Sequence, residues 1–402
     1  MSETTALHAA QDVSDRRSKH IDIVFLALTL LILAVGLVML LSASYAREYY
    51  TTGNPMRIFN RQVLLSAVGI VALLILTTLP ETFYDKFAII SVVVSVIGLI
   101  VVLFVGTEAD TGGVRAILIG PISIQPSEFA KFTVILAFAK LSVRNEKKMK
   151  KLRSTLDFKQ NWKYRLKVEL WYTVFPYCVI LAVICGLLVL EPHVSACIIF
   201  IFITGAMMFQ SGTKIRYLLI LLALVALAGI FMYKTGVPGD YVKQRVVVWQ
   251  DPWNTEDPVV DKWGYQTRQS LIAVGSGGLM GLGLGQSRQK HLYLPEEHND
   301  FIFSIVCEEL GFVGALLILS MFVLLIVRGY WLALRAKTKF SSLVIAGITT
   351  QLALQVFLNV SVVTNLIPCT GISLPFFSYG GSALLCQMSG MGIILALSKQ
   401  PN

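Results

Sequence analysis

The sequence predicts an all-α integral membrane protein built as a bundle of ten transmembrane helices. Its 402 residues are 55% hydrophobic and only 14% charged, whereas a soluble domain carries about 25% charged residues. The mean hydropathy is +0.70. Ten apolar stretches also approach or reach the roughly 17–25 residues with which a helix crosses a bilayer.

Each predicted span is one of these stretches. The two weakest are the fourth, which contains Glu128, Lys131 and Lys140, and the sixth, which is short. In chain order the stretches are residues 21–45, 62–80, 87–106, 127–143, 171–190, 194–210, 217–235, 301–327, 342–363 and 380–398.

The distribution of lysine and arginine predicts the orientation, because cytoplasmic loops of membrane proteins are enriched in these residues. With the N-terminus inside, the cytoplasmic segments hold 21 of the 34 and the outer segments hold ten. Six of those ten lie in the long loop of residues 236–300, and long loops cross the membrane regardless of charge. We therefore expect cytoplasmic N- and C-termini and a large extracytoplasmic loop between helices 7 and 8.

The expected organisation is a cytoplasmic tail (1–20), a single polytopic membrane domain (21–398) that includes the outer loop, and a short C-terminal tail (399–402). The basic run from Arg144 to Lys167 is explained as a topology determinant beside an anionic leaflet, with a docking site as the alternative. The formal charge of +10 therefore requires no nucleic acid. The six cysteines lack metal-ligand spacing and are interpreted as small buried hydrophobes.

The outer loop is too long to lack structure. Its middle, Gln266 to Leu284, mixes apolar and polar residues with several glycines, which predicts a short amphipathic or re-entrant helix followed by a glycine-rich turn. The loop ends at Asp300, where an apolar helix begins. A structural acid at the start of a helix is one interpretation of Asp300, and a catalytic acid is the other. The helix dipole would lower its pKa, so a base there needs apolar surroundings or a metal ion.

Ionisable residues inside predicted spans are candidates for function. Ser127 is expected to cap the fourth span, with Glu128 in its first turn and Lys131 on the same face; the pair is either a structural ion pair or part of a site. Two further acids, Glu308 and Glu309, must face the bundle or a wet cavity. They are expected to connect span eight to polar residues of span nine, namely Gln351, Gln355 or Asn359.

Several basic residues lie in outer segments, against the topological bias. A site that handles a phosphate-bearing lipid from outside would need such groups, because arginine matches phosphate oxygens bidentately. The alternative is ordinary salt bridging with the acids of the loop. These residues are Arg115, Arg245, Arg268, Arg288 and Lys290.

A set of motifs extends over nearly the whole chain. It comprises Gln125-Pro126-Ser127-Glu128 with Lys131; Gly264-Tyr265-Gln266; Gly281-Leu282-Gly283-Leu284-Gly285-Gln286-Ser287-Arg288; Leu294-Pro295-Glu296; Asp300-Phe301-Ile302-Phe303; Glu308-Glu309-Leu310-Gly311; Gly371-Ile372-Ser373-Leu374-Pro375; and Ser378-Tyr379-Gly380-Gly381-Ser382. Together these motifs resemble the SEDS family of peptidoglycan polymerases. The segments Leu41-Ser42-Ala43-Ser44, Gly53-Asn54-Pro55 and Arg61-Gln62 resemble the division-type branch (FtsW, SpoVE) more than the elongation-type branch (RodA).

The resemblance implies a glycosyltransferase that polymerises lipid II on the outer face of the bacterial cytoplasmic membrane, at the division septum. It implies that Asp300 is the essential acidic residue of the catalytic site. It also implies that a divalent cation (Mg²⁺ or Mn²⁺) binds between Asp300 and the substrate pyrophosphate. The candidate substrate-binding residues are Arg115, Gln125, Glu128, Lys131, Arg268, Gln269, Arg288, Lys290, Glu296, His298 and Ser378.

The expected partners are lipid II, the growing glycan strand, a class B penicillin-binding protein that supplies transpeptidase activity, other division proteins and membrane lipids. Three residues depart from the family pattern: His193, Asn299 and Ala116. The alternatives are a lipid II flippase, an elongation-type polymerase and a scaffold for division proteins. The flippase requires charges along a transbilayer path, whereas the polar residues here cluster on the predicted outer side.

Overall fold

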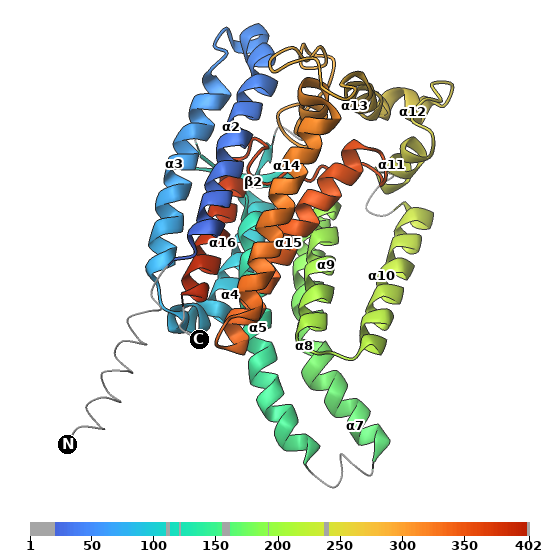
Figure 1. Ribbon diagram of the computed structural model, residues 1–402. Helices are drawn as coiled ribbons and strands as arrows, with labels where there is room; N and C mark the ends of the chain where they lie inside the picture. Colours follow the sequence, from blue (N-terminus) through green and yellow to red (C-terminus); the bar gives the residue numbers. More distant parts are fainter. Residues whose placement is uncertain are drawn as a thin grey trace, which may run out of the picture.

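The computed structural model describes residues 21–109, 113–119, 122–154, 161–191, 193–236 and 241–399. Long helices stand side by side in a bundle, and short helices cover one end of it (Figure 1). The long helices are α2 (Ile23–Thr52), α3 (Arg57–Thr78), α4 (Glu81–Val105), α5 (Pro126–Arg153), α8 (Phe175–Leu190), α9 (Val194–Gln210), α10 (Ile215–Thr235), α14 (Ile302–Leu334), α15 (Lys339–Val363) and α16 (Gly381–Ser398). The helix α7 (Trp162–Glu169) continues through a π-helical turn, η1 (Leu170–Val174), into α8.

Each predicted span overlaps one of these helices. Within the described residues, eight helices are long and apolar enough to cross a membrane. The helix α9 has only 17 residues, and α5 carries the charges noted above. The structure thus confirms a helical protein with several membrane-capable spans. The count of ten and the cytoplasmic position of both termini stay predictions.

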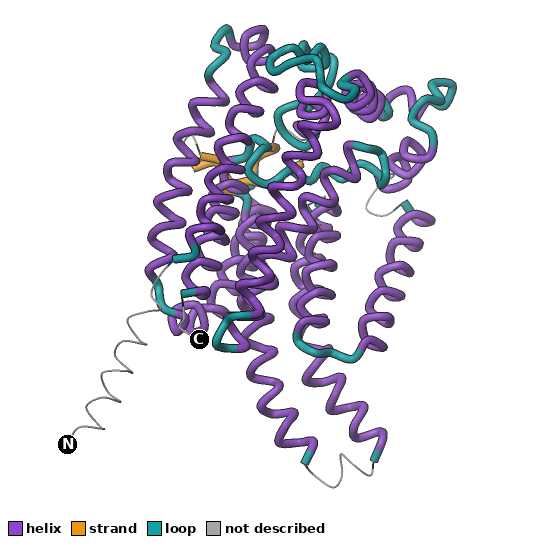
Figure 2. The backbone as a smooth tube through the Cα atoms, viewed as in Figure 1, coloured by secondary structure: helices purple, strands orange, loops and turns teal. Residues whose placement is uncertain are grey.

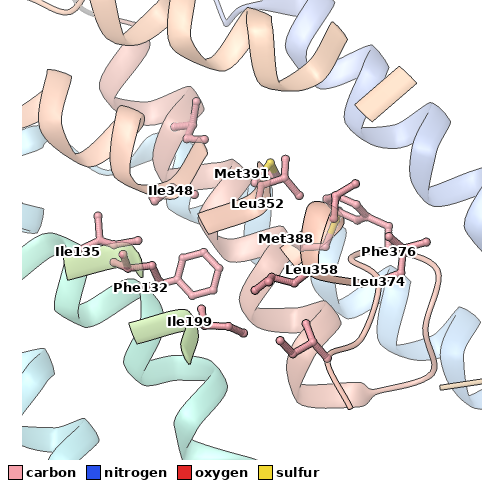
Figure 3. Packing of buried hydrophobic residues seen from close by; sticks show 14 of the residues in the cluster. Phe132, Ile135, Ile199, Ile348, Leu352, Leu358, Leu374, Phe376, Met388 and Met391 are labelled. Carbon is pink, nitrogen blue, oxygen red and sulfur yellow. The ribbon is translucent and has the colours of Figure 1, made fainter. Parts of the chain in front are cut away.

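The core of the bundle is formed around α15. In α15, 78% of the most apolar window is buried inside the protein, compared with 6% in α10, which stands at the edge of the bundle. Lipid tails are as apolar as the helix side chains, so no hydrophobic force drives helices together in a bilayer. The contacts of α15 with its neighbours therefore stabilise the bundle mainly through van der Waals packing. Figure 3 shows this packing, with Phe132 and Ile135 of α5, Ile199 of α9, Ile348 and Leu352 of α15, and Met388 and Met391 of α16.

A small antiparallel sheet lies between α4 and α5, where the sequence indicated only a loop. Its strands are β1 (Thr107–Ala109), β2 (Gly113–Ile119) and β3 (Ile122–Ile124), in the order β1-β2-β3 (Figure 2). In the register, Thr107 opposes Ala116 and Ile117 opposes Ile124. The β-branched residues of this segment favour strands, but strands of three residues are too short to show a period of two.

The outer loop contains three helices, α11 (Tyr241–Gln250), α12 (Pro258–Trp263) and α13 (Tyr265–Ser276). They lie across the end of the bundle (Figure 1). The helix α13 occupies the place of the predicted short helix, and a turn with glycines of positive φ, Gly278 and Gly281, follows it. The sequence did not predict α11 or α12, because ten and six residues are too few to show a clear helical period.

The helix α14 is interrupted at Gly311, whose φ of 65° and ψ of −170° are not helical. The backbone of the glycine-rich turn enters this break. Its amides at Leu282 and Gly283 donate to the carbonyls of Glu308 and Glu309 at 3.0 and 2.9 Å. In return, the amides of Phe312 and Val313 donate to carbonyls of the turn, at Gly278 and Leu279, over 2.9 and 3.1 Å. The turn therefore satisfies backbone groups that a helix break leaves without partners.

The side chains of Glu308 and Glu309 extend this attachment, and both are buried. Glu309 accepts hydrogen bonds from Ser42 of α2 at 2.7 Å and from Lys290 at 2.9 Å. Glu308 accepts from the hydroxyl of Ser287 and from loop amides. The expectation that these acids bind polar residues of span nine is wrong. They bind the outer loop and Ser42 of α2 instead, because the backbone of the glycine-rich turn lies against α14 at residues 308–313.

Substitution Gly311→Ala should destabilise the protein. A Cβ at this position would lie 2.2 Å from the amide nitrogen of Gly281 and 2.6 Å from the carbonyl oxygen of Leu279, and the positive φ would add strain, which at a single residue is worth about 1–3 kcal/mol. We expect the melting temperature of the purified protein in detergent to fall by several degrees.

The control is Gly186→Ala in α8, where an added Cβ meets nothing within 4 Å among the described residues. It should leave the melting temperature unchanged or raise it, because alanine stabilises a helix relative to glycine. Equal melting temperatures for Gly311→Ala and the wild type would show that the break is not needed for stability.

Candidate functional site

The backbone around Asp300 is fixed by two elements from later in the chain. The side-chain amide of Asn359, on α15, donates to the carbonyl of Asp300 at 2.7 Å and to that of Ile372 at 2.7 Å. The hydroxyl of Ser378 donates to the carbonyl of Asn299 at 2.6 Å. These bonds hold the Asp300 segment against α15 and the irregular segment before α16.

The carboxyl group of Asp300 is less constrained than its backbone. Its Oδ1 is buried and has no hydrogen-bond partner among the described residues. Its Oδ2 lies beside Gly371, where an added Cβ would be 3.5 Å away. Buried polar atoms are normally hydrogen-bonded. The Oδ1 of Asp300 is therefore an acceptor that a ligand can use.

The pKa of Asp300 is raised to about 7, mainly by burial and then by the negative charge of Glu296. Its own backbone amide, Arg245 and His298 act in the opposite direction. From the sequence we expected a base at this position to need apolar surroundings that offset the helix dipole, and burial is indeed the largest cause of the raised pKa. Asp300 also lies outside α14, which begins at Ile302.

Three neighbours set the electrostatics at this carboxyl. Glu296 has a φ of 56° and accepts a hydrogen bond from the side chain of Asn299. Arg245, on α11, donates to the carbonyl of Cys369. The carbonyl of His298 accepts from the amide of Tyr379 at 2.8 Å. Of these, Arg245 was noted in the sequence only as an outer basic residue. Its place beside Asp300 depends on the unpredicted helix α11.

A second polar cluster lies at the N-terminus of α5. The Nζ of Lys131 is 2.8 Å from the carboxylate of Glu128, and Lys131 is buried. The cap residue is Gln125, with Pro126 as the first helical residue. The prediction that Ser127 caps the helix is wrong, because it lies inside the first turn and its hydroxyl is buried without a hydrogen-bond partner among the described residues.

One short segment contacts both clusters. Within it, Ser378 binds the backbone beside Asp300, and Ser382 accepts from the amide of Gln125 at 3.0 Å and donates to the carbonyl of Ser123. Residues 378–382 thus contact the Asp300 segment at one end and the start of α5 at the other. Among the described residues, no ion pair joins Lys131 to Asp300. The side chain of Arg115 lies outside what the structure describes.

The other candidate residues of the outer loop do not form one cluster. Arg268 donates to the carbonyls of Pro252 and Val260 at 3.0 and 3.1 Å, which closes the loop between α11 and α13. Lys290 is buried in its ion pair with Glu309. Gln269 is half-buried on α13, and Arg288 is exposed.

Two cavities open near the outer loop. The larger, about 490 Å³, is lined mainly by apolar and tyrosine side chains of α2 and by residues 284–285 and 290–291. The smaller, about 360 Å³, lies between the ends of α2 and α3 and is lined by polar residues that include Glu296, His298 and Asn299. The smaller cavity therefore adjoins the residues that immediately precede Asp300.

The described residues contain no group of three or more His, Cys, Asp and Glu side chains that could hold a metal ion. A dedicated protein-built metal centre does not fit this site. Magnesium, however, is commonly bound by one or two carboxylates together with substrate phosphates and water. The bare Oδ1 of Asp300 fits a cation of that kind.

Curated relatives match along almost the full length. The chain is 36% identical over 379 residues to stage V sporulation protein E of Bacillus subtilis, covering 94% of this chain and 97% of the relative. It is 35% identical over 392 residues to a probable peptidoglycan glycosyltransferase FtsW of Saccharophagus degradans, covering 96% and 94%.

Solved structures share the fold. A chain from a peptidoglycan synthase complex, described for its coordination of polymerization and crosslinking, gives a TM-score of 0.73 at 26% identity, covering 94% of this chain and 98% of that one. The rod shape determining protein RodA of Thermus thermophilus gives 0.65 at 26% identity, covering 95% and 98%.

The family model for FtsW, RodA and SpoVE, described as cell cycle protein, matches residues 22–402. The resemblance to SEDS proteins inferred from the motifs is confirmed, and relatives named FtsW and SpoVE support the division-type branch. This chain belongs to the family of cell cycle proteins that includes FtsW, RodA and SpoVE.

Proposed function

We propose that this protein is a peptidoglycan glycosyltransferase that polymerises lipid II for septal wall synthesis, on the outer face of the cytoplasmic membrane. The relatives named as probable peptidoglycan glycosyltransferases support the activity. The observation that carries the proposal is Asp300: its backbone is fixed, its carboxyl group is buried, and Oδ1 accepts no hydrogen bond from any residue that the structure describes.

In the proposed reaction, Asp300 accepts the proton from the 4-hydroxyl of the N-acetylglucosamine of one lipid-linked saccharide. The resulting oxygen forms a bond to the anomeric carbon of the N-acetylmuramic acid of the other. The bond from that carbon to the pyrophosphate oxygen breaks, with inversion, and undecaprenyl pyrophosphate leaves with the electron pair. Strand length grows by one disaccharide in each cycle.

The raised pKa suits this role. A carboxylate with the ordinary aspartate pKa is a weak base at neutral pH, whereas a base whose pKa lies near the working pH combines sufficient ionisation with sufficient basicity. The structure gives Asp300 a pKa of about 7 through burial and the charge of Glu296. A pKa in this range supports the role of Asp300 as a base.

The leaving pyrophosphate develops negative charge, which nearby cations stabilise in a site of low dielectric. Arg245 already acts on the Asp300 carboxyl, and Lys131 lies at the other cluster that the segment 378–382 contacts. We propose Arg115, Glu128 and Gln125 for the same substrate region. A Mg²⁺ or Mn²⁺ ion bound by Asp300 and the substrate pyrophosphate would supply further charge neutralisation.

The proposed partner is a class B penicillin-binding protein that cross-links the new strands at the septum. The structural similarity to a chain of a peptidoglycan synthase complex supports an assembly of this kind. The two activities complement each other chemically, since the glycan strands made by one are the substrate of the other.

Substitution Asp300→Asn should abolish strand synthesis while preserving the fold. The asparagine keeps the shape of the side chain but cannot accept the proton, so the rate should fall by about 10²–10⁴-fold. Product length on a gel, after incubation of purified protein with lipid II, measures this loss. The melting temperature at pH 8 should stay equal or rise, because the substitution removes a carboxylate that burial disfavours.

The matched control is Glu256→Gln, which removes an exposed acid from the same outer loop. It should retain the wild-type rate. If Asp300→Asn polymerised lipid II as fast as this control, Asp300 would have no part in the chemistry.

The rate should depend on pH through the ionisation of Asp300. Because the folded-state pKa is raised to about 7, the base is protonated and inactive below that pH. The rate at saturating lipid II should therefore rise roughly tenfold per unit between pH 5 and 6 and level off above pH 7. Initial rates across this range test the expectation, and a flat profile would contradict it.

A further inference from the structure

A helical hairpin extends past the bundle at the end opposite the outer loop (Figure 1). Its two described arms are the end of α5 (residues 142–154) and α7 with η1 (residues 161–174). The arms are packed together. Met149 and Val168 form a small buried cluster between them, and the side-chain amide of Asn145 donates to a carbonyl of η1 at 2.8 Å. The hairpin is therefore a structured unit with a small core of its own.

One face of the α5 arm is a stripe of positive charge. Basic residues recur there with the spacing i, i+3, i+4 and i+7, which places their side chains on a single face of a helix. This face is distinct from the one with which Asn145 and Met149 contact the other arm. All the residues of the stripe are exposed, and they are Arg144, Lys147, Lys148 and Lys151, here called the basic stripe.

The acids of the described hairpin already bind other cations. The carboxylate of Glu146 lies 3.1 Å from the Nζ of Lys150 and 2.7 Å from that of Lys339. The carboxylate of Glu169 is buried and pairs with two basic residues around the start of α10, at 2.5 and 2.6 Å. The third acid of this stretch, Asp157, lies outside the described residues. The basic stripe therefore presents positive charge that none of the described acids pairs with.

Membrane orientation alone does not account for this arrangement. A topology determinant needs positive charge near the ends of spans, and the α7 arm already supplies it with exposed Lys163, Arg165 and Lys167. It does not need charges aligned on one face of a helix, or a hairpin with a packed core. An aligned and exposed set of like charges is instead typical of a surface that recognises a partner of the opposite charge.

The far end of the basic stripe lies beyond the expected lipid head groups. Trp171 and Phe175 are exposed and stack with their ring centroids 4.6 Å apart, and exposed aromatic residues of this kind mark a membrane interface. Asn145 binds the carbonyl of Tyr172, so the stripe begins at the level of these rings. Its last residue, Lys151, is roughly 9 Å farther along the helix, whereas the head-group layer is about 5–7 Å thick. This position favours a soluble partner over a lipid.

We propose that the basic stripe docks an acidic segment of a cytoplasmic protein. The predicted orientation places this end of the bundle inside the cell. Carboxylates three or four residues apart on a helix of the partner match the spacing of the cations along α5. The surface lies at the opposite end of the bundle from the outer loop (Figure 1), so this contact serves recruitment of the protein and takes no part in sugar transfer.

The test is the fluorescence anisotropy of a labelled peptide of repeated Glu-Glu-Leu, added to the full-length protein in phosphatidylcholine nanodiscs at physiological salt. The double variant Lys147→Gln, Lys151→Gln should bind this peptide about fivefold more weakly, the scale of two exposed ion pairs. A peptide of repeated Gln-Gln-Leu should not bind the wild type. Absence of binding by the acidic peptide, or an unchanged affinity in the double variant, would overturn the proposal.

The matched control is the double variant Lys150→Gln, Arg153→Gln. It removes the same charge from the same helix, but from the face that carries Glu146. It should bind the acidic peptide nearly as the wild type does, and both variants should keep the wild-type melting temperature because all four side chains are exposed. Equal weakening in the two variants would show that only general charge attraction acts, and the stripe would not be a docking site.

A competition experiment tests lipid as the occupant. Unlabelled acidic peptide should displace the labelled one, whereas soluble dihexanoyl phosphatidylglycerol should not. If this short-chain lipid displaced the peptide as readily as the unlabelled peptide does, the stripe would be a lipid site and the proposal would be wrong. Strand synthesis in the same nanodiscs should be equal for both double variants and the wild type, since the stripe is remote from Asp300.

Discussion

The attachment of the outer loop to the bundle depends on two adjacent buried carboxylates, those of Glu308 and Glu309. They stand where α14 is broken, and they bind the glycine-rich turn, Lys290 and α2. Removing one partner of such a buried pair commonly costs about 3–5 kcal/mol, because the remaining charge is left without compensation. The positions of α13 and of the segment that ends at Asp300 therefore rest on charges that do not themselves need to meet a substrate.

Asp300 combines a fixed backbone with an unsatisfied carboxyl. The hydrogen bonds from Asn359 and Ser378 act on main-chain carbonyls, so the position of the side chain is set without using its oxygens. Such an arrangement holds a reacting group in place before a substrate arrives. The next residues back along the chain, His298 and Asn299, line the cavity between the ends of α2 and α3, so this cavity adjoins the segment that ends at Asp300.

The sequence was sufficient for the features that repeat over many residues or that match a family motif: the long helices, the short helix α13 and the family to which the chain belongs. It was insufficient where one residue or a distant contact decides the outcome. The break at Gly311, the partners of Glu308 and the cap at Gln125 each involve contacts with a remote segment. The arginines of α2 and α3 were visible as outer charges, but only the fold brings Arg47 and Arg57 to one cavity.

The low burial of α10 contrasts with the firm attachment of α11, the helix that follows it in the chain. Only 6% of the apolar window of α10 is covered by protein. The helix α11, however, is bonded to the segment after α15, because Arg245 donates to the carbonyl of Cys369 and the indole of Trp249 donates to the carbonyl of Asn365. These bonds hold the guanidinium of Arg245 where its charge partly offsets the effect of burial on the pKa of Asp300, so the position of this cation is set by contacts of α11 and not by those of α10.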